Sequence, residues 1–410
     1  MKKTKNNSRK DFVWNAVGLT LNACNSLFFL IVVRFINGLD VAGIFTYTFA
    51  LCVFFYAFVI YFNRSFQVSD SSFSFNDYLT CRTITSIIGL VAILIFALVN
   101  QFSSFEIAVV LLLSGFRIIE AISDCFYGAI QKKNKLYQTG ISLSLKAIFG
   151  LLAFYLVDWF THDLALGIVA LIIINLLFFC FYDLKCYRKL YKDKIKFSFT
   201  HLKSILKAAL PIVIFSTLAI YLSNCQKYIL PYFESDDIQA IFGILIMPAT
   251  VLGLVGSYLI NPFINKFTLH HQQKNYTKYI SSAQKLLVVL TGIGLGAFIV
   301  CYFVGIPLLE LIFQLNLSDY LWPLQFIVLA SVFYAAAMIV SSLLTILGEN
   351  RRQTYVYFIA ALVATITAIW FIPNFGIFGA VYSFLISSFI LIVLYITLLQ
   401  FKLHGVKNAK

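Results

Sequence analysis

Charged side chains are scarce in this chain, and long polar stretches are missing. Charged residues make up 12% of the sequence and hydrophobic residues 61%, whereas an ordinary soluble domain has about 25% charged residues. No polar segment is long enough to fold as a separate soluble domain. The short alternating segments typical of a membrane β-barrel are also missing. The composition therefore predicts a helical protein that crosses a membrane many times.

Motifs for metal, nucleotide or disulfide chemistry are missing as well. The eight cysteines include no CxxC pair, which argues against a zinc knuckle or a disulfide framework. His162 and the pair His270–His271 have no further ligands or catalytic partners nearby. There is no glycine-rich nucleotide loop, so an ion gradient is a better energy source than ATP. We expect no catalytic residue, no metal and no cofactor, and hence no enzyme.

Apolar runs recur from one end of the chain to the other. Each is near the length of about 20 residues that spans the hydrocarbon of a bilayer. The twelve runs lie at 14–36, 41–62, 83–101, 106–128, 137–157, 164–182, 208–231, 239–262, 286–308, 321–346, 355–372 and 377–400. The sequence predicts an all-α integral membrane protein with about 12 transmembrane helices.

Lysine and arginine are missing from every loop that would face outward. If the basic amino terminus is cytoplasmic, the inner loops hold nearly all basic residues, Arg64 and Arg82 among them, and the outer loops hold acids such as Glu106 and Asp158. This positive-inside pattern predicts that both termini are cytoplasmic. The net charge of +14 then reflects orientation and some contact with anionic lipid, and we expect no nucleic-acid partner. The first run is too long for a cleaved signal peptide.

The longest basic segment follows six runs and divides the chain. We predict an amino-terminal lobe at 1–182, a cytoplasmic linker at 183–207 and a carboxyl-terminal lobe at 208–410. The halves echo each other faintly, since Ala42-Gly43-Ile44-Phe45 corresponds to Gln239-Ala240-Ile241-Phe242. Because each half has an even number of helices, both halves begin on the same side. The predicted repeat is therefore parallel, about a pseudo-two-fold axis.

Six ionisable residues lie inside the predicted spans. The cations are Arg34, Arg117, Lys146 and Lys227, and the acids are Glu120 and Asp124. A charge at the bilayer centre costs at least about 2.5–3.5 kcal/mol on insertion scales, so each needs a partner, water or a ligand. The positive balance would suit an anionic group such as a phosphate.

Three of these residues share one face of the fourth helix. Arg117, Glu120 and Asp124 are spaced i, i+3 and i+7, which brings their side chains together. Two interpretations stay open: a structural salt bridge, or a site where the guanidinium holds an anion and a carboxylate exchanges a proton or cation. Lys146, on the next helix, is the expected neighbour.

The other two cations end the first helix of each half. Arg34 and Lys227 could extend to the outer headgroups, or they could be kept on that side to bind a ligand. Polar stripes on the same helices predict a wet lining, although hydrogen bonds between helices would also explain them. The asparagines of these stripes are Asn15, Asn22, Asn25 and Asn224.

Short motifs occur in a fixed order along nearly the whole chain. They are Trp14-Asn15 through Arg34, Gly43-Ile44-Phe45, Arg64…Gln67-Val68-Ser69-Asp70, Arg117…Glu120-Ala121…Asp124…Tyr127-Gly128…Gln131-Lys132, Asn224…Lys227-Tyr228, Met247-Pro248 and Gly305-Ile306-Pro307. As an ordered set they resemble Wzx-type flippases of O-antigen and capsular polysaccharide. These form the polysaccharide transport family of the multidrug/oligosaccharidyl-lipid/polysaccharide exporter superfamily.

The resemblance implies two six-helix lobes around a cationic cavity that opens alternately to each side of the bacterial cytoplasmic (inner) membrane. The implied substrate is an oligosaccharide repeat unit on undecaprenyl pyrophosphate, moved from the inner to the outer leaflet. A polysaccharide polymerase and a chain-length regulator are implied partners besides membrane lipid. The implied substrate contacts are Arg34, Arg117, Lys146 and Lys227, and the implied ion-coupling residues are Glu120 and Asp124.

Two other functions stay open. A drug or cation antiporter of the same superfamily would need an anionic or apolar pore, which the positive balance inside the spans disfavours. A membrane-embedded polysaccharide polymerase or glycosyltransferase would present acids, arginines or histidines on a large outer loop. The longest predicted outer loop, 309–320, has no histidine, arginine or lysine.

Overall fold

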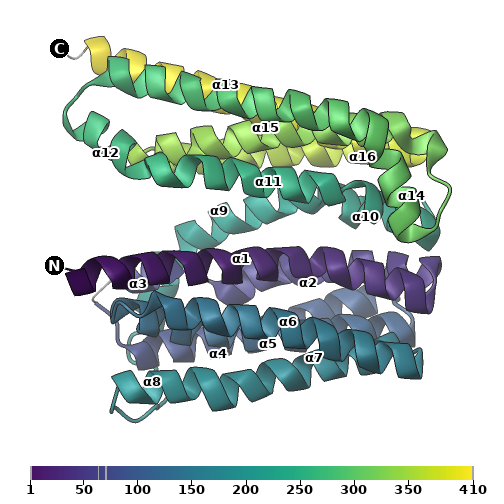
Figure 1. Ribbon diagram of the computed structural model, residues 1–410, viewed down its shortest axis with the longest axis horizontal. Helices are drawn as coiled ribbons and strands as arrows, with labels where there is room; N and C mark the ends of the chain where they lie inside the picture. The colour runs from purple at the N-terminus through teal and green to yellow at the C-terminus, as the bar shows by residue number, and fades with distance from the viewer. Residues whose placement is uncertain (1, 63, 70–71, 409–410) are drawn as a thin grey trace. The chain divides into compact units, whose positions relative to one another are not determined.

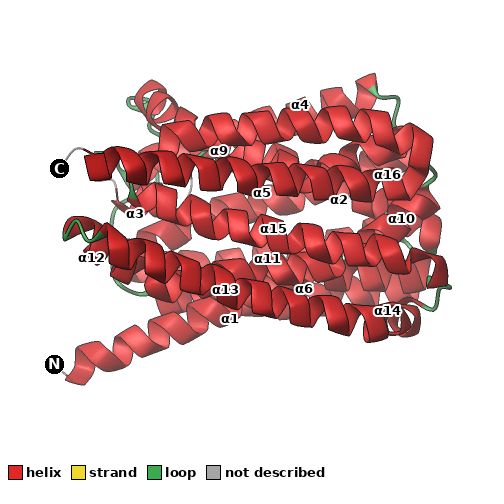
Figure 2. Ribbon diagram, turned by 90° about the horizontal axis from the view of Figure 1, so that it is seen from above, coloured by secondary structure: helices red, strands yellow, loops and turns green. Residues whose placement is uncertain are grey.

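The computed structural model describes residues 2–62, 64–69 and 72–408, and this part of the chain contains helices and loops but no strand (Figures 1 and 2). It divides into two compact units, Met1–Thr217 and Leu218–Lys410, called unit 1 and unit 2 below. The predicted all-α fold is confirmed.

Unit 1 consists of long helices joined by short connections (Figure 1). They are α1 (Lys2–Asn37), α2 (Leu39–Ile60), α3 (Arg64–Ser69), α4 (Phe75–Val99), α5 (Ser104–Lys132), α6 (Leu136–Thr161), α7 (Leu164–Phe178), the π-helix η1 (Phe179–Asp183) and α8 (Leu184–Leu190). The next helix, α9 (Leu202–Ile229), begins in unit 1 and ends in unit 2.

Unit 2 continues with a series of helices interrupted by short irregular turns. They are η2 (Leu230–Tyr232), α10 (Asp236–Leu245), α11 (Met247–Ile260), η3 (Asn261–Phe263), α12 (Ile264–Gln272), α13 (Tyr276–Val300), η4 (Cys301–Gly305), α14 (Ile306–Phe313), η5 (Ser318–Tyr320), α15 (Leu321–Ile346) and α16 (Asn350–Asn408). The last of these is two helices, because Gly376 reverses the chain with φ 55° and ψ −130°. Such positive φ values favour glycine.

Ten helices in the described residues are long and apolar enough to cross a bilayer. Helix α5, which carries Arg117, Glu120 and Asp124, is not among them, and α16 counts once although Gly376 divides it. These two features account for the difference from the twelve predicted runs, and the count of twelve stays a prediction. The chain is a multi-pass membrane protein.

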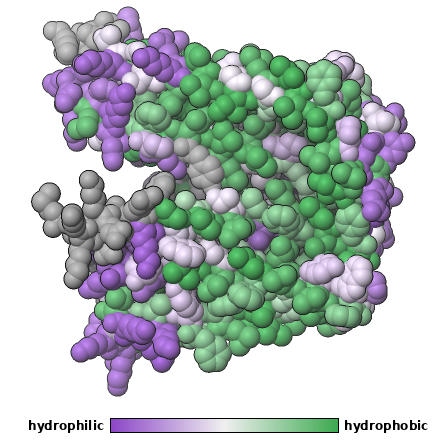
Figure 3. All heavy atoms as spheres, in the orientation of Figure 1, coloured by the Kyte–Doolittle hydropathy of each residue, from purple (hydrophilic) through white to green (hydrophobic). Residues whose placement is uncertain are grey.

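The outer surface of α4 shows how these helices meet lipid. Its exposed side chains recur at helical spacing and are all large and apolar: Ile87, Ile88, Val91, Ile95, Leu98 and Val99. The opposite face is buried against α2, where Gly89 contacts Val59. An exposed apolar stripe of this kind faces acyl chains. Hydrophobic residues cover the middle of the helices, and hydrophilic residues gather at their ends (Figure 3).

Acidic residues near the predicted outer loops begin helices. Glu106 accepts a hydrogen bond from the backbone N–H of Ser103 at 2.7 Å and completes a capping box for α5. Asp163 accepts one from the N–H of Ala165 at 2.8 Å at the start of α7. Carboxylates at these positions satisfy free amides and complement the helix dipole.

Several charged residues that the sequence placed in loops lie inside helical segments instead, and three buried ones show this best. Arg82 was assigned to an inner loop, but a capping box starts α4 at Phe75, so Arg82 is helical and fully buried. Asp158 was assigned to an outer loop, but it is buried in α6 and accepts a hydrogen bond from Asn37 at 2.7 Å. Asp183 was assigned to the linker, but it is buried in η1, because the helix of α7 continues through η1 into α8.

The boundary between the two units falls inside α9, between Thr217 and Leu218. The first half of α9 packs on unit 1, where Ile205 and Ala209 join a buried aromatic cluster. Residues 191–201, the non-helical remainder of the predicted linker, therefore lie in unit 1 with the start of α9. The predicted lobe boundaries themselves stay a prediction.

Candidate functional site

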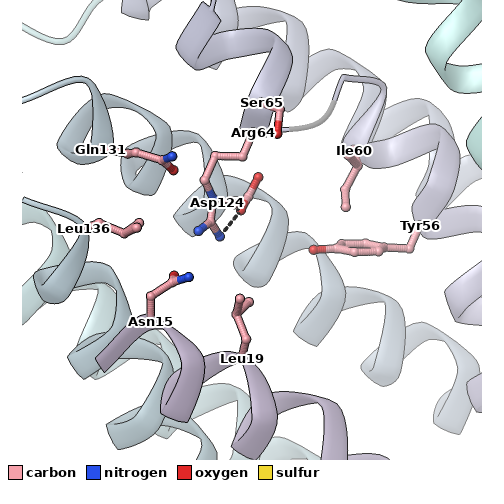
Figure 4. A pocket seen from close by; sticks show the side chains of 9 residues that line it. All are labelled: Asn15, Leu19, Tyr56, Ile60, Arg64, Ser65, Asp124, Gln131 and Leu136. Carbon is pink, nitrogen blue, oxygen red and sulfur yellow. Dashed lines mark hydrogen bonds and ion pairs between the residues drawn. The ribbon is translucent and has the colours of Figure 1, made fainter. Parts of the chain in front are cut away.

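A cavity of about 420 Å³ lies inside unit 1 (Figure 4). Side chains from α1, α2, α3, α5 and α6 line it: Asn15, Leu19, Tyr56, Ile60, Arg64, Ser65, Asp124, Gln131 and Leu136. The lining mixes charged, amide and hydroxyl groups with apolar ones. The cavity can therefore hold water or a polar ligand, unlike the lipid-facing stripe of α4.

An arginine and an aspartate meet at this cavity (Figure 4). Arg64 donates to Oδ1 of Asp124 from Nε at 2.9 Å and from Nη2 at 2.5 Å. The chain leaves α2 at Tyr61, whose φ of 51° is left-handed, and α3 then begins at Arg64 beside α5. The two charged side chains are 20% and 18% exposed, so a ligand in the cavity can reach the pair.

A second arginine lies behind the same carboxylate. Nη2 of Arg82 is 3.8 Å from Oδ2 of Asp124 and donates to the carbonyl of Phe62 at 3.0 Å. The guanidinium also lies over the Phe62 ring, 4.3 Å from its centroid. Nε and Nη1 of Arg82 are buried and have no hydrogen-bond partner among the described residues. One carboxylate thus faces two guanidiniums, and the cluster keeps a positive charge and unused donors.

Close packing of α3 on α5 fixes the position of Arg64. Gln67, one turn later in α3, is buried and donates from Nε2 to the carbonyl of Cys125 at 2.9 Å. Gly128 lies directly against the Gln67 amide, where any Cβ would collide with it. Only glycine permits this approach. The sequence motifs that contain Arg64 and Gly128 therefore meet in space.

A second ion pair lies on α5, nearer its amino terminus. Arg117 donates from Nη1 to Oε2 of Glu120 at 2.7 Å, and its guanidinium lies over the Phe49 and Tyr56 rings of α2 at 4.6 and 5.5 Å. The three charges that we expected on one face of this helix thus divide. Arg117 pairs with Glu120, whereas Asp124 pairs with Arg64.

A third ion pair is buried between α5, α6 and η1. Lys146 donates to Asp183 at 2.6 Å, to Ser123 at 2.7 Å and to the hydroxyl of Tyr127 at 3.1 Å. Ser142 donates to the other oxygen of Asp183 at 2.6 Å. All three ammonium hydrogens thus have a partner, and both carboxylate oxygens accept. The wider turn of a π-helix places Asp183, and such turns are frequent at functional sites.

The structure places the other two predicted cations elsewhere. Arg34 lies in the last turn of α1, and its buried Nε has no hydrogen-bond partner among the described residues. Lys227 lies in the last turn of α9, in unit 2, where its backbone carbonyl accepts from Nε2 of Gln239 at 3.2 Å.

The predicted asparagines take different positions. Asn15 lines the cavity, and its buried Oδ1 has no partner among the described residues. Asn22 is half-buried and Asn25 is buried, farther along α1. Asn224 donates to the carbonyl of Ile220 at 3.1 Å within α9. No cluster of histidine, cysteine and acidic residues in the described part of the chain is arranged to hold a metal.

Sequence reasoning missed three residues of these clusters: Arg64, Arg82 and Asp183. All three lie just beyond the ends of predicted apolar runs, so hydropathy assigned them to loops. The available signal was the shared motif of Arg64 and Gln67. Here the polar motif marks a short separate helix, α3, that begins just beyond the end of α2.

Comparisons with known proteins agree with a transporter fold. No protein-family profile matches the chain. The capsular polysaccharide biosynthesis protein CapF of Staphylococcus aureus is 23% identical over 389 residues, which are 94% of this chain and 98% of that protein.

Solved structures extend the likeness over nearly the whole chain. An inward-facing multidrug resistance MATE family transporter of the MOP superfamily has a TM-score of 0.64 at 15% identity, covering 98% of this chain and 95% of that one. A MOP superfamily transporter from Pyrococcus furiosus, described as having a binding pocket of reverse polarity that suggests a different function, has a TM-score of 0.58 at 13% identity, covering 97% and 95%. The resemblance to exporters of this superfamily predicted from the sequence is confirmed.

Proposed function

We propose that this chain, which has the fold of the MOP superfamily transporters, is a polysaccharide flippase. It moves oligosaccharide repeat units linked to undecaprenyl pyrophosphate from the inner to the outer leaflet of the bacterial cytoplasmic membrane. An ion gradient drives alternating access. The cargo belongs to capsule or a related surface polysaccharide.

The arginine cluster of unit 1 is the observation that carries this proposal. Arg64 and Arg82 share the single carboxylate of Asp124 beside a cavity of about 420 Å³. A lipid-linked sugar carries its negative charge on the pyrophosphate, and guanidinium forks bind phosphate oxygens in pairs. The full-length similarity to a capsular polysaccharide biosynthesis protein supports the same class of cargo.

Asp124 acts as an internal substitute for the phosphate. A phosphate oxygen replaces Oδ1 of Asp124 on Nε and Nη2 of Arg64, because a single oxygen of either group can accept from both nitrogens. Arg82 then supplies its unused Nε and Nη1 donors after a small shift. Released from Arg64, Asp124 can take up a proton or a cation. Cargo binding and ion binding are thereby linked, as the resemblance implies for this residue.

Arg117 and Lys146 have a more indirect part in this scheme. Each already has a carboxylate partner, Glu120 or Asp183, and contacts cargo only by exchanging it. We assign Glu120 to ion coupling together with Asp124. We still assign Arg34 and Lys227 to contacts with the acidic or polar parts of the cargo.

A drug or cation antiporter is the second candidate, because multidrug transporters share the fold. A cationic cargo would be repelled by the two arginines at Asp124. The test therefore includes a cationic dye as competing cargo.

The experiment uses the purified full chain in liposomes. A fluorescent oligosaccharide on undecaprenyl pyrophosphate is placed in one leaflet, and its arrival in the other is measured with a membrane-impermeant quencher. We expect transfer that depends on the protein and on an imposed proton or sodium gradient. Transfer of the cationic dye but not of the lipid-linked sugar would overturn the proposed function.

A matched pair of variants distinguishes a loss of cargo binding at the cavity from a nonspecific effect of removing an arginine. Arg64→Gln removes the guanidinium at the cavity, whereas Arg352→Gln removes an exposed one in unit 2. Transfer should fall with the first variant and stay near the native rate with the second. If both variants transfer cargo at the native rate, the proposed transport function stands, but Arg64 is not part of the binding site.

A further inference from the structure

The connection between α8 and α9 has no part in the proposed transport site. Between Tyr191 and Thr200 it reads Tyr-Lys-Asp-Lys-Ile-Lys-Phe-Ser-Phe-Thr. The chain enters it from the membrane span Leu164–Leu190 and leaves it into the span Leu202–Tyr232. The segment therefore connects the same-side ends of two candidate spans, a few basic residues beyond the apolar runs that end at 182 and begin at 208.

The segment is fixed against the amino-terminal end of α4 by hydrogen bonds at alternate residues. Asn76 accepts from the N–H of Lys196 at 3.1 Å and donates to the carbonyl of Lys194 at 3.4 Å. Thr80 accepts from the N–H of Ser198 at 2.8 Å. Backbone groups that face one side at every second residue are typical of an extended chain. The segment thus has a defined conformation, although it is not part of a helix.

Asp77 strengthens this attachment. It closes the capping box of α4 with Ser74, and its other carboxylate oxygen accepts from the hydroxyl of Ser198 at 2.5 Å. His201 approaches Asp77 at 3.3 Å and continues the contact to the start of α9. One buried carboxylate therefore joins the helix cap, the segment and the next span.

In the extended segment, the apolar side chains lie on the face opposite to Ser198, whose hydroxyl contacts Asp77 of α4. Ile195, Phe197 and Phe199 are 38%, 64% and 66% exposed. In an extended chain, side chains two residues apart share a face. Two phenylalanines fixed in water would be unfavourable, because removing such a side chain from water is favourable. Their exposed face needs an occupant.

The surrounding charge is strongly basic. Lys192, Lys194 and Lys196 are all exposed within the segment, and the one acid between them is Asp193. Exposed basic residues continue on both flanks: Lys185, Arg188, Lys189, Lys203 and Lys207. Aromatic and basic side chains together at a membrane boundary match a surface of anionic headgroups above acyl chains.

We propose that the segment from Lys192 to Phe199, held on α4, binds anionic phospholipid of the adjacent leaflet. Ile195, Phe197 and Phe199 enter the interface. Lys192, Lys194 and Lys196 lie on the opposite face, and their long side chains extend around the segment to bind phosphodiester headgroups. The segment anchors the connection that leads from unit 1 toward unit 2 to the membrane surface. A protein partner is the other class of occupant, but the position between two spans favours the lipid that is already there.

The test replaces Phe199 by tryptophan in the full chain and places the protein in nanodiscs of phosphatidylglycerol and phosphatidylcholine. Two preparations have the same lipid composition and differ only in which lipid carries bromine, which quenches indole fluorescence at contact. The native protein, with its four tryptophans, gives the background to subtract. We expect the added indole of Phe199→Trp to be quenched more by brominated phosphatidylglycerol, at least about twofold, because each lysine near the surface favours an anionic lipid roughly fivefold.

Charge variants supply the matched comparison. Lys192→Gln/Lys194→Gln/Lys196→Gln should abolish the preference for phosphatidylglycerol, and so should high salt. The control Lys266→Gln/Lys274→Gln/Lys278→Gln removes three exposed lysines that lie near α12 and α13 in unit 2, and it should leave the preference intact. Phe197→Trp repeats the measurement if Phe199→Trp is poorly folded.

Either of two results would overturn the proposal. If neither brominated lipid quenches the added indole, the segment is not in the membrane, and a protein partner becomes the better occupant. If both lipids quench it equally and the lysine variants change nothing, the segment lies in lipid without selecting anionic headgroups. The outcome does not depend on what the protein transports.

Discussion

The interiors of the two units are polar in different ways. In unit 1 the polar contacts include charged pairs at three places: Arg64 and Arg82 with Asp124, Arg117 with Glu120, and Lys146 with Asp183. In the described part of unit 2 the buried polar residues are amides and hydroxyls, apart from Glu349 near a helix end. Interior ion pairs are thus a feature of unit 1, whereas unit 2 has mostly neutral hydrogen bonds together with a partly buried cation, Lys227.

Buried side chains of unit 2 make neutral hydrogen bonds. Gln226 donates to Ser383 at 3.2 Å, and Tyr221 is 2.7 Å from the hydroxyl of Thr365. Its ion pairs in the described residues are those of Glu349 with Arg352 and Lys402. A neutral hydrogen bond in a membrane protein is worth only about 0.6 kcal/mol on average.

This difference between the units indicates where a ligand or ion can change the conformational equilibrium of the protein. Removing one member of a buried ion pair leaves an uncompensated charge and costs about 3–5 kcal/mol, whereas a neutral bond costs much less to lose. An arriving anion or cation can therefore change the equilibrium of unit 1 by exchanging partners in its pairs. Unit 2 has few ion pairs whose partners an arriving ion could replace.

The largest effect should follow from Lys146→Met, which leaves Asp183 buried with no ammonium partner; the two side chains are 6% and 1% exposed. We expect a loss of about 3–5 kcal/mol in the free energy of unfolding, measured by thermal unfolding in detergent. Lys146→Met/Asp183→Leu should recover most of this loss, because it removes both charges. If Lys146→Met is as stable as the native protein, the ion pair of Lys146 and Asp183 does not stabilise unit 1.

The second effect is on transport. Arg64→Gln should slow cargo transfer by about 10–100-fold, since a charge-assisted hydrogen bond contributes roughly 1.5–3 kcal/mol. Stability should change little, because this side chain is partly exposed. Arg64→Lys keeps the positive charge but loses the two-nitrogen geometry of the guanidinium. Its transfer rate should therefore lie between the rates of the native protein and of Arg64→Gln. If lysine restores the full rate, charge alone matters and bidentate binding is not required.

The third prediction concerns competition at the same arginine. Asp124→Asn removes the carboxylate that we propose phosphate replaces, so inorganic pyrophosphate should bind up to about fivefold more tightly, as expected for a partly exposed ion pair. Binding is measured by calorimetry on the solubilised protein. The variant should also weaken the dependence of transfer on pH or sodium. Unchanged affinity together with unchanged ion dependence would remove Asp124 from both roles.

The sequence predicted the apolar helices well, because hydropathy is a local property. It did not predict the partners. Asp124 pairs with Arg64 from α3, which is distant in sequence and packs on α5 where Gly128 lies against Gln67. Partner choice is a tertiary property that periodicity does not encode.

Helix ends explain the remaining differences. Arg82 and Asp183 were assigned to loops because charge lowers hydropathy at the ends of the apolar runs. The capping box of α4 and the π-helix η1 carry the helices past those ends and bury both residues. A charge next to an apolar run is therefore better treated as a possible member of the helix, with a partner to be found.

The smallest effect should come from unit 2, and it completes the comparison. Gln226→Leu removes the bond to Ser383 and also a buried carbonyl oxygen that has no partner among the described residues. The two changes oppose each other, because losing a hydrogen bond destabilises and losing an unsatisfied polar atom stabilises. We expect a change in unfolding free energy below about 1 kcal/mol and a transfer rate close to native. A loss as large as that of Lys146→Met would mean that neutral bonds constrain unit 2 as strongly as ion pairs constrain unit 1, and the contrast between the units would fail.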